Sequence, residues 1–217
     1  REIIKDLLKW KESSNRKPLI VHGARQVGKT YIIKQFGKEN YNNLIYVNFE
    51  TNQEFSSQIS EHIDAKYIIN KLELFYGEKI LPGKTLIFFD EIQANERALT
   101  ALKYFYEEAP EYHVIAAGSL VGIAINRKNY SFPVGKVQMI NMYPLSFKEF
   151  CQNENNEMRE YQKYIENGGF PYLINLEDDK ELIRNYLDGI YNTVLMKDVI
   201  YRNNIKDVMI LESVIKF

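Results

Sequence analysis

The chain of 217 residues is 45% hydrophobic, with a formal net charge of −1 and a pI of about 6.4. This length suffices for one full α/β core plus a small appendage. The near-zero net charge gives no whole-chain electrostatic support for nucleic-acid binding.

A single cysteine, Cys151, excludes an intrachain disulfide and fits a reducing cytoplasm. The longest uncharged apolar run, residues 114–125, is about half of the ~20 residues that a membrane span needs. The sequence therefore predicts a cytoplasmic protein without a membrane segment.

In chain order, the first expected element is an amphipathic helix over residues 1–12. Apolar side chains recur there at helical spacing between charged residues, at Ile3, Ile4, Leu7 and Leu8. We expect this helix to dock on the core, because it does not have the pattern of a signal peptide.

Residues 23–30 read Gly-Ala-Arg-Gln-Val-Gly-Lys-Thr and match the phosphate-binding pattern G-x-x-x-x-G-K-[ST] in full. The flanks fit as well, since residues 17–22 read as a short buried strand and residues 31–36 as the start of a helix. Glycines that lack a Cβ permit a close approach of the backbone to a polyphosphate. We therefore expect the loop and the start of its helix to bind ATP through these residues: Gly23, Ala24, Arg25, Gln26, Val27, Gly28, Lys29, Thr30 and Tyr31.

An apolar strand is expected over residues 86–91, and it ends in two carboxylates. In loops of this kind the lysine, here Lys29, meets the β and γ phosphates, and the hydroxyl of Thr30 binds Mg²⁺. An acidic residue at the end of an apolar strand holds the Mg²⁺ shell, which assigns Asp90 to the metal site together with Thr30. The sequence therefore predicts Mg²⁺ and ATP as the bound species.

Glu91 bears on the class of reaction. A second carboxylate beside the metal ligand can orient and deprotonate an attacking water, whereas a kinase has no need of such a water. Glu91 is therefore the candidate general base, and Lys29 the residue that stabilises phosphate charge; the alternative for Glu91 is a solvated residue at a helix start. Two interpretations of Gln93 are open: it helps to place the water or senses the γ phosphate, or it is an ordinary surface side chain.

A further strand over residues 112–117 runs into Gly118 and Ser119. In P-loop NTPases the strand beside the loop strand often ends in a small polar residue that touches the γ phosphate or the water. We assign Ser119 this catalytic role, with a simple Gly-Ser turn as the alternative.

Five strands that mostly alternate with helices are expected at residues 17–22, 44–50, 86–91, 112–117 and 136–142. This order argues for an α/β fold in which helices cover both faces of a five-stranded, mainly parallel sheet, the three-layer α/β/α arrangement of P-loop NTPases. Such sheets bind ligands outside the carboxyl ends of their strands. The phosphate loop, Asp90, Glu91 and Ser119 are therefore expected to converge there.

The chain resembles the prokaryotic AAA-like ATPases that carry an uncharacterised C-terminal domain. The matching segments are residues 17–20, 22–30, 89–93, 117–120, 131–136, 143–150 and 168–171. The resemblance spans residues 1–207, and the Arg25-Gln26 pair inside the loop makes it specific. It implies ATP, Mg²⁺ and an ATPase whose core is followed by a helical lid; a packing appendage is the alternative for the lid.

The chain departs from many family members at residue 136, where Lys follows Gly135 and an Arg would be a candidate phosphate-contacting or trans-acting residue. Lysine lacks the planar fork of arginine, so an arginine finger at Lys136 is in doubt. Arg127 and Arg202 are other candidates, with surface charges as the alternative interpretation.

Family members continue well past 217 residues and this chain begins without Met, so we expect an N-terminal fragment whose C-terminal domain is missing. Its parts are expected to be an ATPase core with the N-terminal helix at residues 1–151 and a helical, lid-like subdomain, truncated at its end, at residues 152–217. The boundary falls in a polar stretch after a helix that Ser146 and Glu149 begin with a capping box. Gly168-Gly169 reads as a hinge or as a helix stop before an X-Pro turn.

These features favour an enzyme that hydrolyses ATP to ADP and phosphate with Mg²⁺ and is coupled to an output domain or partner. Without an assigned arginine finger, turnover by the isolated chain is expected to be slow unless the chain self-associates. The alternative is a nucleotide-dependent switch or scaffold that binds ATP without significant hydrolysis. A small-molecule kinase is disfavoured because Glu91 suits a water nucleophile.

Overall fold

The computed structural model describes residues 1–119, 132–151, 157–176, 179–194, 199–200, 205 and 207–216. The chain divides into two compact units, residues 1–144 and 145–217, and each is described by itself. Three features of the sequence interpretation lie outside the described residues: Arg127, Arg202 and the polar stretch 152–156. No helix among the described residues is long and apolar enough to cross a membrane.

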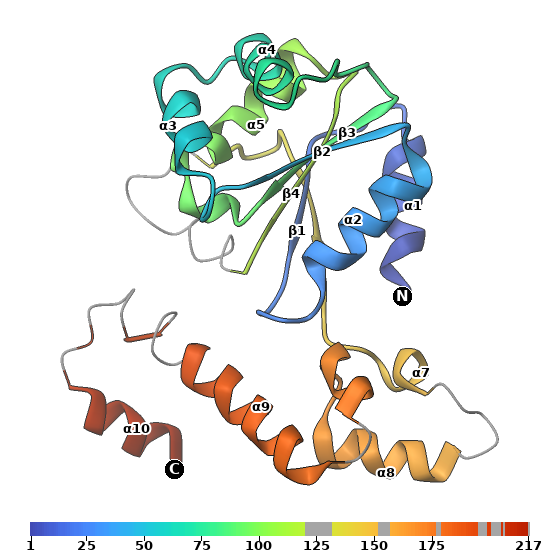
Figure 1. The fold of residues 1–217 in the computed structure, drawn as a ribbon, viewed down its shortest axis with the longest axis vertical. Coiled ribbons are helices and arrows are strands. Elements are labelled where there is room, and N and C mark those ends of the chain that lie inside the picture. Colours follow the sequence, from blue (N-terminus) through green and yellow to red (C-terminus); the bar gives the residue numbers. More distant parts are fainter. Residues whose placement is uncertain are drawn as a thin grey trace. The chain divides into compact units, whose positions relative to one another are not determined.

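The first unit is built on a five-stranded sheet in the order β2-β3-β4-β1-β5, and every neighbouring pair is parallel (Figure 1). The strands are β1 (Leu19–His22), β2 (Asn43–Asn48), β3 (Thr85–Asp90), β4 (His113–Gly118) and β5 (Gln138–Asn141). Every residue of β3 and β4 is buried, as expected for inner strands that are covered on both faces. The prediction of a five-stranded, mainly parallel sheet is confirmed.

Helices cover both faces of this sheet (Figure 1). They are α1 (Ile3–Glu12), α2 (Lys29–Asn40), α3 (Gln53–Glu61), α4 (Ala65–Tyr76), the 3-10 turn η1 (Ile92–Ala94) and α5 (Glu96–Glu108). Because side chains alternate along a strand, Ile87 and Phe89 of β3 pack with α5 in the main core, while Leu86 lies against Gly37 of α2. The three-layer α/β/α arrangement is therefore confirmed.

Local signals explain where three of these helices begin. Asn52, Asp64 and Asn95 each accept a hydrogen bond from a backbone N–H in the first turn of α3, α4 and α5 respectively. Such caps satisfy N–H groups that have no partner inside the helix. The cap at Asn95 matters for the site, because it fixes the chain just after β3.

The second unit is helical and contains α7 (Phe147–Phe150), α8 (Glu157–Asn167), the 3-10 helix η3 (Pro171–Leu176), α9 (Lys180–Thr193) and α10 (Val208–Lys216). The predicted capping box is present, since Ser146 and Glu149 exchange both of its hydrogen bonds. The ring of Phe147 packs on Tyr161 and Tyr164, with centroids 5.3 and 5.7 Å apart. These contacts join α7 to α8 within the second unit, which begins at Leu145, whereas the sequence placed the start of the helical part at residue 152.

The Gly168-Gly169 pair ends α8. Gly168 has a φ of 80°, and its N–H donates to the carbonyl of Tyr164 at 2.9 Å, the geometry of a glycine helix stop. A Cβ on Gly169 would lie 2.3 Å from the carbonyl oxygen of Leu145. The described geometry therefore agrees with the helix-stop interpretation.

Candidate functional site

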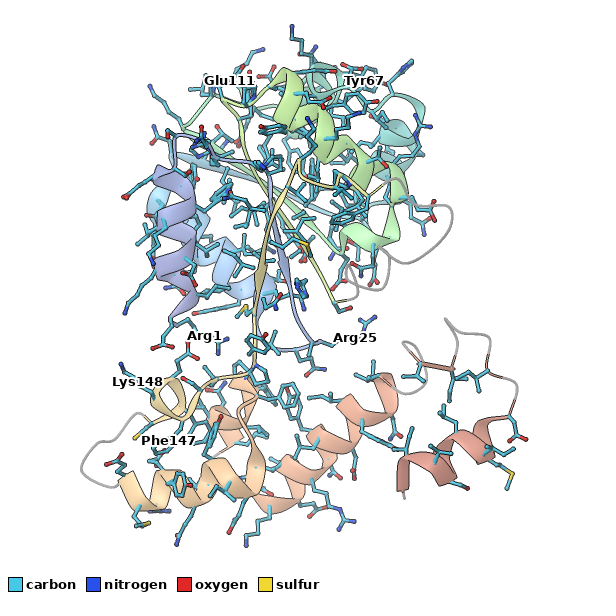
Figure 2. All side chains as sticks on the ribbon, turned by 180° about the vertical axis from the view of Figure 1, so that it is seen from behind. Arg1, Arg25, Tyr67, Glu111, Phe147 and Lys148 are labelled. Carbon is cyan, nitrogen blue, oxygen red and sulfur yellow. The ribbon has the colours of Figure 1, made fainter. Side chains whose placement is uncertain are left out.

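The ends of neighbouring strands bring the predicted site residues to one edge of the sheet. His22 is in register with Gly118, and Asn48 with Asp90. Because the strands are parallel, the phosphate loop after β1, Asp90 at the end of β3 and Ser119 after β4 all lie at the carboxyl edge. Figure 2 places Arg25 on the loop at that end of the first unit and Glu111, which precedes β4, at the other.

The phosphate loop leads into α2 through backbone geometry that suits its sequence. Gly28, the N-cap of α2, has a φ of 92°, which glycine adopts readily. Gln26 also has a positive φ, 61°, and Val27 is fully buried and anchors the loop to the core. The helix therefore presents its first N–H groups at the loop, the arrangement that binds phosphates.

Gly23 is required for a reason that the sequence did not reveal. A Cβ on Gly23 would lie 2.0 Å from the carbonyl oxygen of Met142, in the segment after β5. Residue 23 must therefore be glycine because the backbone of the phosphate loop packs closely against the backbone of the segment after β5. The expected approach of Gly23 to a phosphate remains a prediction.

The side chain of Lys29 is hydrogen-bonded to the backbone of the phosphate loop. Its side chain is buried, and Nζ donates to the carbonyl oxygens of Gly23 at 2.9 Å and Ala24 at 2.7 Å. The ammonium group therefore lies over the loop backbone. Burial, followed by the charge of Lys29, lowers the pKa of nearby His22 below its ordinary value.

Thr30 and Asp90 are in direct contact. The Thr30 hydroxyl donates to Oδ2 of Asp90 at 2.8 Å, and the Glu91 N–H donates to Oδ1 at 3.1 Å. Asp90 is 2% exposed. Burial raises the pKa of its carboxyl group above the ordinary value, and the hydrogen bond from Thr30 acts in the opposite direction.

Tyr46 is a member of the site that sequence reasoning missed. Its hydroxyl donates to Oδ2 of Asp90 at 3.1 Å, and Nζ of Lys34 lies 3.3 Å from the centre of its ring. Burial raises the pKa of Tyr46 above its ordinary value. Alternation along β2 places Tyr46 on the same sheet face as Leu44, which lies against Gly37 of α2, but its contact with Asp90 depends on the register of β2 beside β3.

Glu91 occupies a sharp turn between β3 and η1. Its backbone lies in the left-handed region with a φ of 49°, a conformation that is uncommon for residues other than glycine. Its side chain accepts a hydrogen bond from Nε2 of Gln93. The carboxylate of Glu91 is thus held by its own turn, directly after Asp90.

The remaining predicted residues differ in their placement. Ser119 follows β4 directly, and its buried Oγ has no hydrogen-bond partner among the described residues. The side chain of Tyr31 is 73% exposed. Lys136 precedes β5, at the edge opposite the phosphate loop, where Nζ pairs with Glu107 at 3.1 Å. This position does not bring Lys136 to the site of its own chain.

The donor set suits a hard divalent cation. Thr30 offers a hydroxyl oxygen and Asp90 a buried carboxylate, and Mg²⁺ in nucleotide sites takes one or two such groups together with phosphates and waters. Among the described residues, no group of three or more His, Cys, Asp or Glu side chains could hold a metal. Thr30 and Asp90 therefore fit a cation whose other ligands come from a nucleotide and water.

The family model for the AAA domain matches residues 15–151, more than half of the chain. The chain belongs to this family, and its site is that of an AAA-type P-loop nucleotide-binding domain. An uncharacterised protein of Haemophilus influenzae is 27% identical over 234 aligned positions, which cover 99% of this chain and 53% of that protein. An uncharacterised protein of Methanocaldococcus jannaschii is 26% identical over 216 positions, covering 90% of this chain and 45% of that protein. The chain thus spans about half the length of these relatives.

Two solved structures are similar at a lower level. One is DnaA from Aquifex aeolicus bound to AMPPCP, with a TM-score of 0.47, 18% identity and coverage of 100% of this chain and 67% of that one. The other is the Orc1 protein of Aeropyrum pernix in complex with DNA, with a TM-score of 0.41, 14% identity and coverage of 74% and 48%.

Proposed function

We propose that the chain binds ATP with Mg²⁺ at the phosphate loop and hydrolyses it to ADP and phosphate. The observation that carries this proposal is the direct bond from Thr30 to Asp90, with Glu91 next in the chain. A P-loop hydroxyl, a buried carboxylate and a second carboxylate are the parts that hydrolysis requires at one place.

The residues act as follows in this proposal. Lys29 and the N–H groups at the start of α2 bind the β and γ phosphates and stabilise the charge that develops on them. Thr30 and Asp90 would hold Mg²⁺, which when bound neutralises phosphate charge. Glu91 accepts the proton of the attacking water. Ser119 contacts the γ phosphate or that water.

Turnover by the isolated chain is expected to be slow. An arginine finger contributes about 10³ to 10⁵ in rate where it is present, and Lys136 is engaged with Glu107 at the far edge of the sheet. We infer that a second copy or a protein partner supplies an arginine to the site. This pairing of Lys136 also favours the second candidate, a switch that binds ATP without significant hydrolysis.

The wider role is part of the same proposal. The helical unit at residues 145–217 would act as a lid, and hydrolysis would be coupled to an output domain or partner beyond the part of the relatives that the chain matches. The process that ATP drives is a property of that whole protein.

Phosphate release from Mg²⁺·ATP at increasing protein concentration tests the proposal, with Lys29→Ala run beside the wild type. We expect the specific activity of the wild type to rise with concentration, and Lys29→Ala to lose ATP binding. ATP binding by the wild type with no phosphate release at any concentration would reject hydrolysis by this chain and leave the switch.

A further inference from the structure

The turn that carries Glu91 is fixed at both of its ends. At its start the Glu91 N–H donates to Asp90, and the Ala94 N–H donates to the Glu91 carbonyl at 2.9 Å. At its end Nδ2 of Asn95 donates to both the carbonyl oxygen and Oγ of Ser56, at 2.9 and 2.7 Å. Asn95 is itself 6% exposed. A side chain on this turn therefore has a defined position relative to Asp90.

Gln93 lies on this turn, and its amide has one possible orientation. A carboxylate accepts hydrogen bonds only, so the NH₂ group of Gln93 must face Glu91, as it does in the structure. The carbonyl oxygen Oε1 then faces away from Glu91. It is buried, and the described residues offer it no donor.

This environment is not that of a surface glutamine. A buried acceptor without a donor costs about 1 to 3 kcal/mol, whereas a solvated amide pays no such penalty. The contact with Glu91 is also the only hydrogen bond of the Gln93 side chain that is seen among the described residues. Among the described residues, the side chain of Gln93 is therefore held by Glu91 alone.

We propose that Gln93 is a positioning residue for Glu91. Its amide N–H holds one carboxylate oxygen, which fixes the direction in which the other oxygen can accept a proton from water. This inference rests on the proposed hydrolysis, because Gln93 acts through Glu91. A general base contributes about 10² to 10⁴ in rate, and loss of its orientation removes part of that factor.

The test uses Gln93→Met in the full chain, a change that keeps the side-chain size and removes the donor. We expect kcat for ATP hydrolysis to fall about tenfold or more, because the base loses its orientation, while KM and the Kd for ATP stay within about twofold. In the Glu91→Gln background the same change should have no further effect on kcat, since two residues that act as one unit are not additive.

Gln35→Met is the matched control. Nε2 of Gln35 donates to Oε1 of Glu39 at 2.8 Å, which is the same amide-to-carboxylate bond on the exposed side of α2. Its removal should leave kcat unchanged. If Gln93→Met does not fold, Gln93→Glu replaces it, because this change also removes the donor and sets a like charge beside Glu91.

The outcomes separate the inference from the proposed function. A wild type that binds ATP but never hydrolyses it overturns both. A wild type that hydrolyses ATP, with Gln93→Met at the same rate, overturns the positioning role alone. A higher kcat in Gln93→Met also overturns it, because Gln93 would then restrain Glu91, and equal losses in kcat and in ATP affinity would indicate a merely structural role.

Discussion

The hydroxyl of Thr30 donates a hydrogen bond of 2.8 Å to Asp90, although 60 positions separate the two residues in the chain. Thr30 is set by the start of α2 and Asp90 by the end of β3, so the contact depends on the parallel register of the sheet. Hydroxyl and carboxylate oxygens together are the ligands expected for Mg²⁺ beside a phosphate.

The Tyr46 hydroxyl should affect Mg²⁺ more than it affects the nucleotide. It donates a hydrogen bond to Oδ2 of Asp90, and removing a group that orients a metal ligand typically weakens metal affinity about 10- to 100-fold. We expect Tyr46→Phe to raise the Mg²⁺ concentration needed for half-maximal ATP binding about tenfold, as measured with a fluorescent ATP analogue.

Tyr67→Phe is the control for this prediction. Tyr67 lies at the start of α4, at the end of the first unit opposite Arg25 of the phosphate loop (Figure 2), and its ring faces His62. Its Mg²⁺ dependence should match that of the wild type. An unchanged Mg²⁺ requirement in Tyr46→Phe would show that the Tyr46 hydroxyl does not orient Asp90 for metal binding.

Gly23→Ala should unfold the first unit more easily, whether or not nucleotide is present. The added Cβ would meet a backbone carbonyl at 2.0 Å, which cannot move without shifting the segment after β5. We expect the free energy of unfolding to fall by about 3 kcal/mol. Denaturant titration followed by fluorescence of the single tryptophan, the buried Trp10 in α1, measures it.

Gly37→Ala provides the comparison within the same unit. Its Cβ would meet side-chain methyl groups of Leu44 and Leu86 at 3.0 and 3.2 Å, and these can shift. Alanine also gains about 1 kcal/mol over glycine in a helix interior. Gly37→Ala should therefore cost much less than Gly23→Ala, and equal losses would contradict the backbone-contact explanation.

His113 should make the folded state less stable in mild acid. It is buried, and its Nδ1 and the Tyr41 hydroxyl are joined by a hydrogen bond of 2.8 Å. Burial, followed by the charges of Arg16 and Lys11, lowers its pKa to about 4 from 6.5. Between these values the unfolded chain binds the proton and the folded chain does not, so stability is lost as the pH falls.

The expected loss from His113 is about 2 kcal/mol in the free energy of unfolding between pH 7 and pH 5. Denaturant titrations followed by circular dichroism measure it, and His113→Gln should remove this part of the pH dependence. The exposed His62 provides the control, because His62→Gln should leave the pH dependence in place. An identical pH dependence in His113→Gln would contradict the assignment.

The sequence predicted those parts of the site that follow from local pattern and chain order. The phosphate-loop pattern placed Thr30 at the start of a helix, and the apolar run before Asp90 made it the end of a strand. Parallel topology then required the two to meet, and the structure shows their contact. Their roles toward Mg²⁺ and ATP remain predictions.

Other features depend on packing that no local pattern encodes. The Tyr46 contact arises because β2 lies beside β3 in a fixed register. The role of Gly23 comes from a segment more than one hundred residues away in the chain, at Met142. The ring of Phe147 packs on Tyr161 of α8 inside the second unit, a contact between distant residues that the polar stretch in the sequence does not indicate.

The most direct test of the central claim is single-turnover cleavage of ATP by wild type and Glu91→Gln, with protein in excess and Mg²⁺ present. The bound nucleotide is recovered by denaturation and identified. We predict ADP from the wild type and intact ATP from Glu91→Gln, with equal amounts of nucleotide bound by both. Conversion of ATP to ADP by Glu91→Gln at the wild-type rate would contradict the assignment of Glu91 as the base.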